Sequence, residues 1–304
     1  MTSRFAAPTT LADALAILAA DRDARPVAGG TDLVVAARQG RTALPESIVA
    51  IDRIAELDRR EVVDGSLVLG ALASHDWLAE SPDVRADWTA LADASAIVGS
   101  PATRGTGTIG GNLMNASPAA DTTAPLVVLD AIATLQAAGG TSRTVAVADL
   151  ATAPGRTVAA RGELLTSVTV PRPASGSGSA YIRLEFRRAM EIAVVGAAAL
   201  VTLNRDGRIA AARVALTAVA PTIVRASPAE AALIGATADA AAFRIAAEAA
   251  AAAARPIDDV RARADYRRAM LVVVVARTLA AATARARGVS IPIPASRWAH
   301  GQEV

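Results

Sequence analysis

Two glycine-rich segments carry the chemistry that this sequence suggests. In the first, Ala28-Gly29-Gly30-Thr31-Asp32, a short apolar segment precedes the glycines and helix-forming residues follow them. Glycine lets the backbone turn sharply and approach a ligand closely, and the start of a helix offers free N–H groups and the positive end of its dipole. These features suit a pyrophosphate. The alternative is a tight strand-to-helix turn capped by Thr31 or Asp32, and for an isolated motif that alternative is the commoner one.

The second segment contains a pattern typical of dinucleotide-binding proteins. Gly105-Thr106-Gly107-Thr108-Ile109-Gly110 satisfies GxGxxG, and Asp130 follows about twenty residues later. That fingerprint requires a strand before the glycines and a helix after them. Ser100-Pro101-Ala102 precedes them, however, and the residues that follow include the poor helix formers Asn112, Asn115, Ser117 and Pro118. The context therefore argues against a Rossmann nicotinamide site.

The other interpretation of the second segment is a loop that binds phosphate through N–H groups and sugar hydroxyls through side chains. The residues that could do so are Thr108, Gly110, Gly111, Asn112, Ser117 and Asp121. The alternative is a long surface loop with Asx turns. The length of the stretch and the presence of two glycine pairs in one chain weigh against that alternative.

The elements that must position these segments follow from apolar patterning and capping residues. Thr10-Leu11-Ala12-Asp13 predicts the capped start of an amphipathic helix, and Asp64-Gly65 predicts the turn of a hairpin over 62–69. We further expect strands at 26–28 and 48–51, helices at 32–39 and 88–97, an irregular stretch from 99 to 118, and apolar elements at 126–133 and 164–170. The N-terminal part is thus a predicted α/β unit.

The C-terminal part is predicted to be a small antiparallel sheet with helices. The Pro-, Gly- and Ser-rich stretch 171–179 is typical of a linker. Strands are expected at 193–203 and 209–219, joined by the turn Asn204-Arg205-Asp206-Gly207. Two alanine-rich helices are expected at 238–254 and 265–287.

Composition excludes several classes of function. The net charge is only +2, and because the chain has no lysine and no cysteine, a small excess of arginine sets the pI of 9.8, so the pI does not indicate nucleic-acid binding. Without cysteine, this chain cannot hold a disulfide or an iron–sulfur cluster. His75 and His300 are too far apart for a conventional zinc site.

No targeting or membrane segment is expected. The start of the chain lacks the long apolar core of a signal peptide, and the longest apolar run, 269–276, is too short to span a bilayer. We therefore expect a cytoplasmic protein without a transmembrane segment.

The glycine segments belong to longer strings that resemble a known family. Arg104 to Leu113, continued by Asn115 to Asp121, closely resembles the FAD-binding medium subunit of molybdenum hydroxylases of the carbon monoxide dehydrogenase and xanthine dehydrogenase type. Ala28 to Leu33 resembles the first flavin loop of that family. Arg188 to Gly196 and Asp265 to Arg268 resemble signatures of its C-terminal domain.

The resemblance implies an α+β fold of two domains. Residues 1–174 would form an FAD-binding domain of the vanillyl-alcohol-oxidase (PCMH) type with two α/β subdomains. A linker would span 175–179, and a domain of a small antiparallel sheet plus a helix bundle would span 180–290. A tail would follow at 291–304.

The resemblance also implies a set of cofactor-binding residues. Backbone groups of two loops would hold the pyrophosphate: Val27, Ala28, Gly29, Gly30, Thr31, Asp32 and Leu33, with Thr108, Ile109, Gly110, Gly111 and Asn112. Asp121 and Ser117 would hydrogen-bond the cofactor, Val98 would pack against it, and Leu165 would lie beside the flavin. Arg183 stands where relatives often carry lysine, which keeps the charge but not the shape.

We nominate no catalytic acid or base and no metal ligand, because the flavin performs the redox step. His75 is expected to be a cap or a surface residue, and Met190 a core residue. Arg187 and Arg188 could stabilise reduced flavin, although a solvated role fits them equally. Gly110→Val is expected to abolish FAD retention while leaving the fold largely intact.

Partners follow from the resemblance as well. FAD would be noncovalent, and iron–sulfur clusters and molybdopterin would reside on a small 2Fe–2S subunit and a large subunit, in a dimer of heterotrimers. An external acceptor, whether oxygen, a quinone or NAD, would take the electrons, and the substrate stays open. The alternatives are a free-standing FAD-dependent oxidoreductase and a flavin-less interaction protein. The lack of cysteine excludes the branch of the family with an extra cluster on the flavin subunit.

Overall fold

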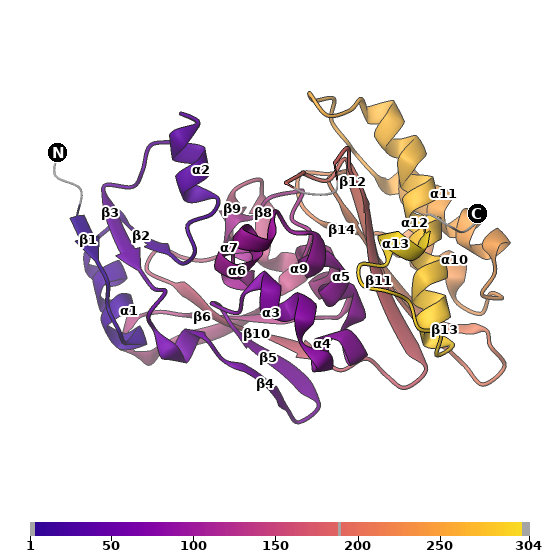
Figure 1. Cartoon of the computed structure of the whole chain (residues 1–304), viewed down its shortest axis with the longest axis horizontal. Coiled ribbons are helices and arrows are strands. Elements are labelled where there is room, and N and C mark those ends of the chain that lie inside the picture. The colour runs from indigo at the N-terminus through magenta and orange to yellow at the C-terminus, as the bar shows by residue number, and fades with distance from the viewer. Residues whose placement is uncertain (1–3, 188–189, 300–304) are drawn as a thin grey trace.

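The structure is a computed structural model that describes residues 4–187 and 190–299. It contains three hydrophobic cores, one for each of two N-terminal subdomains and one for a C-terminal domain. Figure 1 shows the two subdomains and the C-terminal domain in a row, from the N-terminal strands on the left to the C-terminal helices on the right. Arg188, Ala189 and His300 lie outside the described residues.

The first subdomain is a parallel three-stranded sheet with strand order β1-β3-β2. Its helix α1 begins after Thr10, whose Oγ1 accepts a hydrogen bond from the Asp13 amide at 3.2 Å, so the predicted cap is confirmed. The elements are β1 (Arg4–Ala6), α1 (Leu11–Ala20), β2 (Ala24–Val27), α2 (Leu33–Arg38) and β3 (Ser47–Ala50).

The second subdomain is built on an antiparallel five-stranded sheet with strand order β4-β5-β10-β6-β7. The predicted hairpin is confirmed: Asp64 and Gly65 both adopt positive φ, as the twist-matched two-residue turn requires. The strands are β4 (Arg60–Val63), β5 (Ser66–Gly70), β6 (Ile132–Gln136), β7 (Ser142–Ala146) and β10 (Leu164–Pro171), and β8 (Ala151–Ala153) pairs separately with β9 (Arg156–Thr157).

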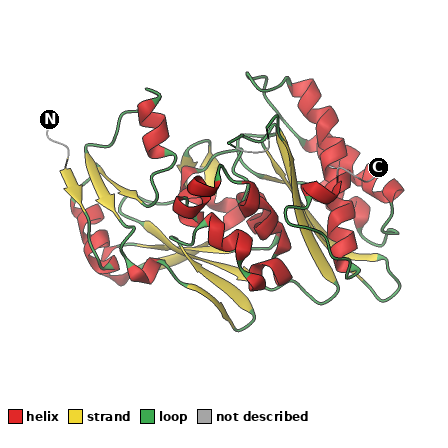
Figure 2. Cartoon of the chain, viewed as in Figure 1, coloured by secondary structure: helices red, strands yellow, loops and turns green. Residues whose placement is uncertain are grey.

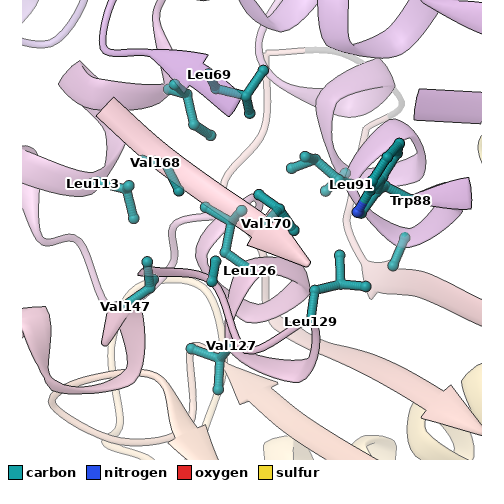
Figure 3. Close-up of a cluster of buried hydrophobic side chains, with 14 of the residues drawn as sticks. Leu69, Trp88, Leu91, Leu113, Leu126, Val127, Leu129, Val147, Val168 and Val170 are labelled. Carbon is teal, nitrogen blue, oxygen red and sulfur yellow. The ribbon is translucent and has the colours of Figure 1, made fainter. Parts of the chain in front are cut away.

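Short helices cover this sheet (Figure 2). Their side chains and those of the sheet form the largest core of the N-terminal half, in which Trp88, Leu91 and Leu126 face Val168 and Val170 of β10 (Figure 3). The helices are α3 (His75–Glu80), α4 (Pro82–Asp87), α5 (Thr89–Ile97), α6 (Pro101–Thr106), α7 (Ile109–Asn115), α8 (Thr123–Val128) and α9 (Val147–Leu150), with single 3₁₀ turns at Ala55–Leu57 and Ala138–Gly140.

The stretch 99–118, predicted to be irregular, contains the helices α6 and α7, so that prediction was wrong. Ser100 and Thr108 each cap the following helix, with Oγ atoms that accept from the amides of Thr103 and Gly111. Helix α7 also buries Ile109 and its neighbours, and this burial outweighs the poor helix propensity of its sequence. A helix therefore does follow the GxGxxG glycines. The rejection of a Rossmann site rests on what precedes them, which is α6 and not a strand.

The C-terminal domain is a layered structure. Its antiparallel sheet, in the order β11-β12-β13-β14, packs on one face against α12 and α10 and on the other against α5 and α8 of the N-terminal half. Helix α11 packs on α10 and α12. The elements are β11 (Ser177–Leu184), β12 (Val195–Leu203), β13 (Ile209–Thr217), β14 (Val224–Arg225), α10 (Ser227–Leu233), α11 (Ala240–Ala253), α12 (Ala264–Ala286) and α13 (Ser296–Ala299). The expected strands, turn and helices are all present.

The connection between the two halves spans 172–176 and lies three residues before the predicted linker. Strand β10 ends at Pro171 and β11 begins at Ser177, so three of the five residues assigned to the linker 175–179 belong to a strand. Gly178 is needed there for packing, because a Cβ on it would lie 2.3 Å from backbone atoms of α12. The composition that suggested a flexible linker instead allows a close approach of strand and helix.

Helix α12 has the length and apolar composition of a membrane span. It packs along β11 and β12, and half of its most apolar window is buried in the domain. Its apolar character is therefore explained by its place in the core.

A buried carboxylate joins the two halves. Asp93 of α5 is fully buried and accepts hydrogen bonds from the backbone amides of Tyr181 and Ala295, at 3.0 and 2.9 Å, and from the Arg285 guanidinium at 2.6 and 2.9 Å. Burial raises the pKa of Asp93, and Arg285 opposes that rise. The residues that Asp93 joins come from β11, from the last turn of α12 and from the segment before α13.

Candidate functional site

The first glycine segment is a strand–turn–helix, as predicted. Strand β2 ends at Val27, Gly30 adopts a positive φ of 66°, and α2 begins at Leu33. The Asp32 side chain makes no capping bond, so the alternative role of a capping turn is not seen for it. The backbone amides of Gly29, Gly30, Thr31 and Asp32 donate to none of the described residues. This turn therefore presents a set of free N–H donors.

The second segment lies directly against the first. A Cβ on Gly29 would be only 1.9 Å from the backbone oxygen of Thr106, so the two segments touch where Gly29 lacks a side chain. The start of α3 holds the second segment on its other side: the His75 amide donates to the Gly107 oxygen, and Ser74 pairs with Thr108 in an isolated bridge. Residues distant in sequence thus meet at one place.

The glycines of the second segment have different roles. A Cβ on Gly110 would lie 2.7 Å from the backbone oxygen of Ala71, because Gly110 is buried against the end of β5. The expectation that Gly110→Val would spare the fold is therefore wrong. By contrast, a Cβ on exposed Gly105 would meet nothing within 4 Å. A Cβ on Gly111 would meet only the hydroxyl of Thr108, at 3.0 Å.

Fewer backbone donors are free in the second segment than the resemblance implies. The amides of Ile109, Gly110 and Asn112 donate to the backbone oxygens of Ala73, Ala71 and Thr108, and Ile109 is a core residue. The Gly111 amide donates to the hydroxyl of Thr108, its own helix cap. The Asn112 side-chain oxygen accepts from Thr122 at 2.8 Å, which leaves its NH₂ group as the donor that could face a ligand.

Asp121 and Arg183, both predicted to contact the cofactor, contact each other. The carboxylate of Asp121 accepts from the Arg183 guanidinium and, at 2.8 Å, from the hydroxyl of Tyr181. Arg183 also donates to Glu185 at 2.7 Å and to the backbone oxygen of Ile97 at 3.0 Å. Burial raises the pKa of Asp121 to about 6, although Arg183 opposes the shift. If Asp121 and Arg183 contact the cofactor, they must do so with a carboxylate and a guanidinium that already bind each other and neighbouring residues.

The other predicted residues fall into two environments. Leu165 is buried in the core of the second subdomain, whereas Val98 is half-buried at the end of α5, next to the oxygen that Arg183 contacts. Ser117 is half-buried and accepts from the Ala119 amide. Met190, expected in the core, is 58% exposed and its amide donates to Gly99, so that expectation was wrong.

Sequence reasoning missed His75. It was expected to be a cap or a surface residue, but Ser74 is the cap of α3 and His75 is only 2% exposed. Burial, assisted by the positive charge of Arg104 on α6, lowers the pKa of His75 to about 4, so the imidazole is neutral at neutral pH. The sequence carried one signal for this, since an apolar segment, Leu67 to Ala73, leads directly into it.

A cavity of about 500 Å³ lies elsewhere, between the β10–β11 connection, β13 and α10. The arginines Arg213 and Arg225 on its wall are paired with Asp130 and Glu230. This cavity includes no residue of either glycine segment.

Comparison with known proteins agrees with the two halves of the chain. Residues 1–173 match the family described as the FAD binding domain in molybdopterin dehydrogenase, and residues 180–282 match the CO dehydrogenase flavoprotein C-terminal domain. The carbon monoxide dehydrogenase medium chain of Hydrogenophaga pseudoflava is 34% identical over 92% of this chain and 97% of its own length. The 6-hydroxypseudooxynicotine dehydrogenase complex subunit alpha of Paenarthrobacter nicotinovorans is 34% identical over 87% of this chain and 88% of its own.

Solved structures are similar over the same extent. A chain of carbon monoxide dehydrogenase from Hydrogenophaga pseudoflava matches with a TM-score of 0.89 and 34% identity, covering 94% of this chain and 98% of that one. A chain of quinoline 2-oxidoreductase from Pseudomonas putida 86 matches with a TM-score of 0.87 and 29% identity, covering 93% and 97%. Sequence and structure agree that the chain belongs to the FAD-binding medium subunits of the molybdenum hydroxylase family.

Proposed function

We propose that this chain is the flavin station of a multi-subunit dehydrogenase: it accepts electrons from a partner iron–sulfur subunit and passes them through noncovalent FAD to an external acceptor. The observation that carries the proposal is the contact of the two glycine segments at Gly29 and Thr106, beside the free amides of Gly29 to Asp32. Free N–H groups at a turn form an anion-binding concavity suited to a diphosphate. The residues present therefore fit the phosphate end of FAD.

The protein contributes binding, orientation and electrostatics, while the bound flavin supplies the two-electron chemistry. The amides of the first segment, with Thr108 and the NH₂ group of Asn112, would hold the diphosphate. The buried Asp121–Arg183 pair joins the α7–α8 connection to β11. It would hold polar groups of the cofactor nearer the flavin. Val98 would lie against the cofactor. Among residues 4–187 and 190–299 we assign no acid or base to substrate chemistry.

Electron supply must come from a partner, because the sequence contains no cysteine and cannot ligate an iron–sulfur cluster. Among the described residues, no group of three or more His, Cys, Asp or Glu side chains could hold a metal ion. A small 2Fe–2S subunit and a large molybdopterin subunit, paired as a dimer of heterotrimers in the cytoplasm, complete the proposal. Oxygen, a quinone or NAD would serve as acceptor.

The test compares the chain alone with the chain co-expressed with the products of its neighbouring genes. The purified chain should be yellow and release FAD on denaturation, yet its flavin should bleach with substrate only in the presence of the partners. A chain that reduces its own flavin with a substrate and turns over unaided would instead be a free-standing oxidoreductase. Colourless protein that ignores added FAD would contradict the proposal altogether.

A further inference from the structure

One arginine lies between two carboxylates next to the second glycine segment. The guanidinium of Arg183 donates to Asp121 on one side and to Glu185 on the other, and its side chain is only 1% exposed. The side chains of Asp121 and Glu185 are 10% and 20% exposed. We call these three residues the Arg183 triad. One positive and two negative charges leave the triad with an excess negative charge in a largely desolvated place.

Among the described residues, the groups around the triad supply no second cation that contacts it. Tyr181 of β11 donates its hydroxyl to Asp121, and burial together with the charge of Asp121 raises the pKa of Tyr181, so this hydroxyl stays neutral. The end of α5 contributes the backbone oxygen of Ile97. Arg104 of α6 donates to the next oxygen, that of Val98, at 3.4 Å and contacts neither carboxylate.

The position of the triad brings its charge close to the proposed diphosphate site. Thr122, which follows Asp121, donates its hydroxyl to the side-chain oxygen of Asn112 at 2.8 Å. The NH₂ group of that same Asn112 is a proposed diphosphate donor. FAD is anionic because its diphosphate is ionised, and a nearby like charge makes a carboxyl group harder to ionise. An anion bound there should therefore make Asp121 hold a proton more tightly.

The structure has a place for the added proton. The Thr217 hydroxyl is buried and has no hydrogen-bond partner among the described residues. It lies next to the Tyr181 hydroxyl, since a Cβ on Gly196 would be 2.7 Å from the Tyr181 oxygen and 3.2 Å from Cβ of Thr217. When Asp121 is ionised, Tyr181 donates to it. When Asp121 is protonated, it can donate to Tyr181, whose hydroxyl then turns to Thr217 and gives that oxygen a partner.

Asp121 is also close to its own titration in the flavin-free protein. Burial, with a contribution from the charge of Glu185, raises its pKa to about 6 against the opposing effect of Arg183. Above pH 7 the carboxyl is therefore ionised in most flavin-free molecules, yet a small change in its surroundings is enough to protonate it. We propose that FAD binding draws a proton onto Asp121 and that the charge of Glu185 drives this uptake; the proposal rests on the FAD site described above.

The first test is the pH dependence of FAD affinity, measured by fluorescence titration of the flavin-free full-length chain. FAD itself takes up no proton between pH 6 and pH 8, because its diphosphate stays ionised and its oxidised flavin ring stays neutral. If FAD makes Asp121 hold its proton about ten- to hundredfold more tightly, the affinity should fall about five- to 25-fold from pH 6 to pH 8. Calorimetric titration at pH 7 in buffers of different ionisation enthalpy should count an uptake of about 0.4–0.8 proton.

Three variants assign the proton and the charge. Asp121→Asn should bind FAD without proton uptake. Glu185→Gln keeps an oxygen that can accept from Arg183 and loses only the negative charge, so it should bind FAD about three- to tenfold more tightly than wild type at pH 8, with a flatter pH dependence. Glu248→Gln is the matched control, because it removes the same charge from an exposed ion pair on α11, and it should behave like wild type.

The outcomes separate the proposal from a merely structural role of the triad. Thermal unfolding of the same flavin-free samples reports structural damage, whereas the proton count does not depend on stability. Equal affinity of wild type at pH 6 and pH 8, uptake that persists in Asp121→Asn, or a Glu185→Gln affinity equal to that of Glu248→Gln would each overturn the proposal. Wild-type protein that fails to bind FAD at either pH would instead contradict the FAD site itself, so the two failures are distinguishable.

Discussion

Gly29→Ala is the sharpest perturbation that the structure offers, because it acts only at the contact between the two glycine segments. The new Cβ would lie 1.9 Å from the Thr106 oxygen, whereas ordinary van der Waals contact begins at 3.4 Å, so the segments must separate by about 1.5 Å (3.4 − 1.9). Overpacking of this kind costs about 1–3 kcal/mol. The φ of Gly29 is not in the left-handed region, so alanine adds no backbone strain there.

The energy of this clash should weaken FAD binding more than it weakens folding. Flavin-free protein can relieve the clash by letting the segments part, but FAD needs both of them in place. An energy of 1–3 kcal/mol corresponds to an affinity about 5- to 150-fold lower, with little change in the unfolding temperature of the flavin-free protein. The assay is a fluorescence titration of that protein with FAD.

Gly105→Ala is the matched control, because it lies in the neighbouring helix α6 with open space around its Cβ position. It should bind FAD like wild type and gain about 0.5–1 kcal/mol in stability. Wild-type affinity in Gly29→Ala would refute the reasoning. So would an equal loss in Gly105→Ala, since the cofactor would then lie over α6.

Further predictions concern the buried charges and a cap. Asp93→Asn should reduce the free energy of unfolding by about 3–5 kcal/mol in urea, because it leaves a buried cation unpaired, whereas Glu248→Gln at an exposed pair should change it by less than about 1 kcal/mol. Because the pKa of Asp121 is raised from 3.8 to about 6, the folded state holds that proton more tightly, and the stability it contributes is lost as pH rises through about 6. The pKa of His75 is lowered from 6.5 to about 4, so its contribution is present above pH 6.5 and is lost as pH falls toward 4. The measurement is urea unfolding between pH 4 and 6.5. The free energy of unfolding should rise with pH more steeply in Asp121→Asn than in wild type, and less steeply in His75→Gln than in wild type. Unchanged slopes would contradict these assignments. Thr10→Ala should lower stability by about 1 kcal/mol in the same assay, and no change would mean that the cap is not formed.

The sequence predicted the elements whose signals are local. The Thr10 cap, the Asp64-Gly65 turn and the long alternating strands of the C-terminal sheet could all be read from a few neighbouring residues. The first glycine segment was also predicted correctly as a strand–turn–helix. In each of these cases the residue types of a short stretch favour the structure that forms.

The predictions that failed were decided by distant contacts. Helix α7 forms in a sequence of poor helix propensity because Ile109 is buried and Thr108 caps it. Gly178 looked like part of a flexible linker, yet it lies where α12 approaches β11. The burial of His75 and the pairing of Asp121 with Arg183 depend on residues from other elements. Apart from the apolar segment before His75, no local pattern reports such contacts.

The buried acids have a consequence for how the chain can be divided. Two family descriptions meet near residue 175, which suggests two modules. Yet Asp93 and Asp121, both in the first module, find their cationic partners, Arg285 and Arg183, in the C-terminal half of the chain. A fragment that ends near residue 173 would lack both cations, and Asp93 would also lose the backbone amides of Tyr181 and Ala295. The chain should therefore unfold as one cooperative unit, and the boundary between the families is evolutionary more than energetic.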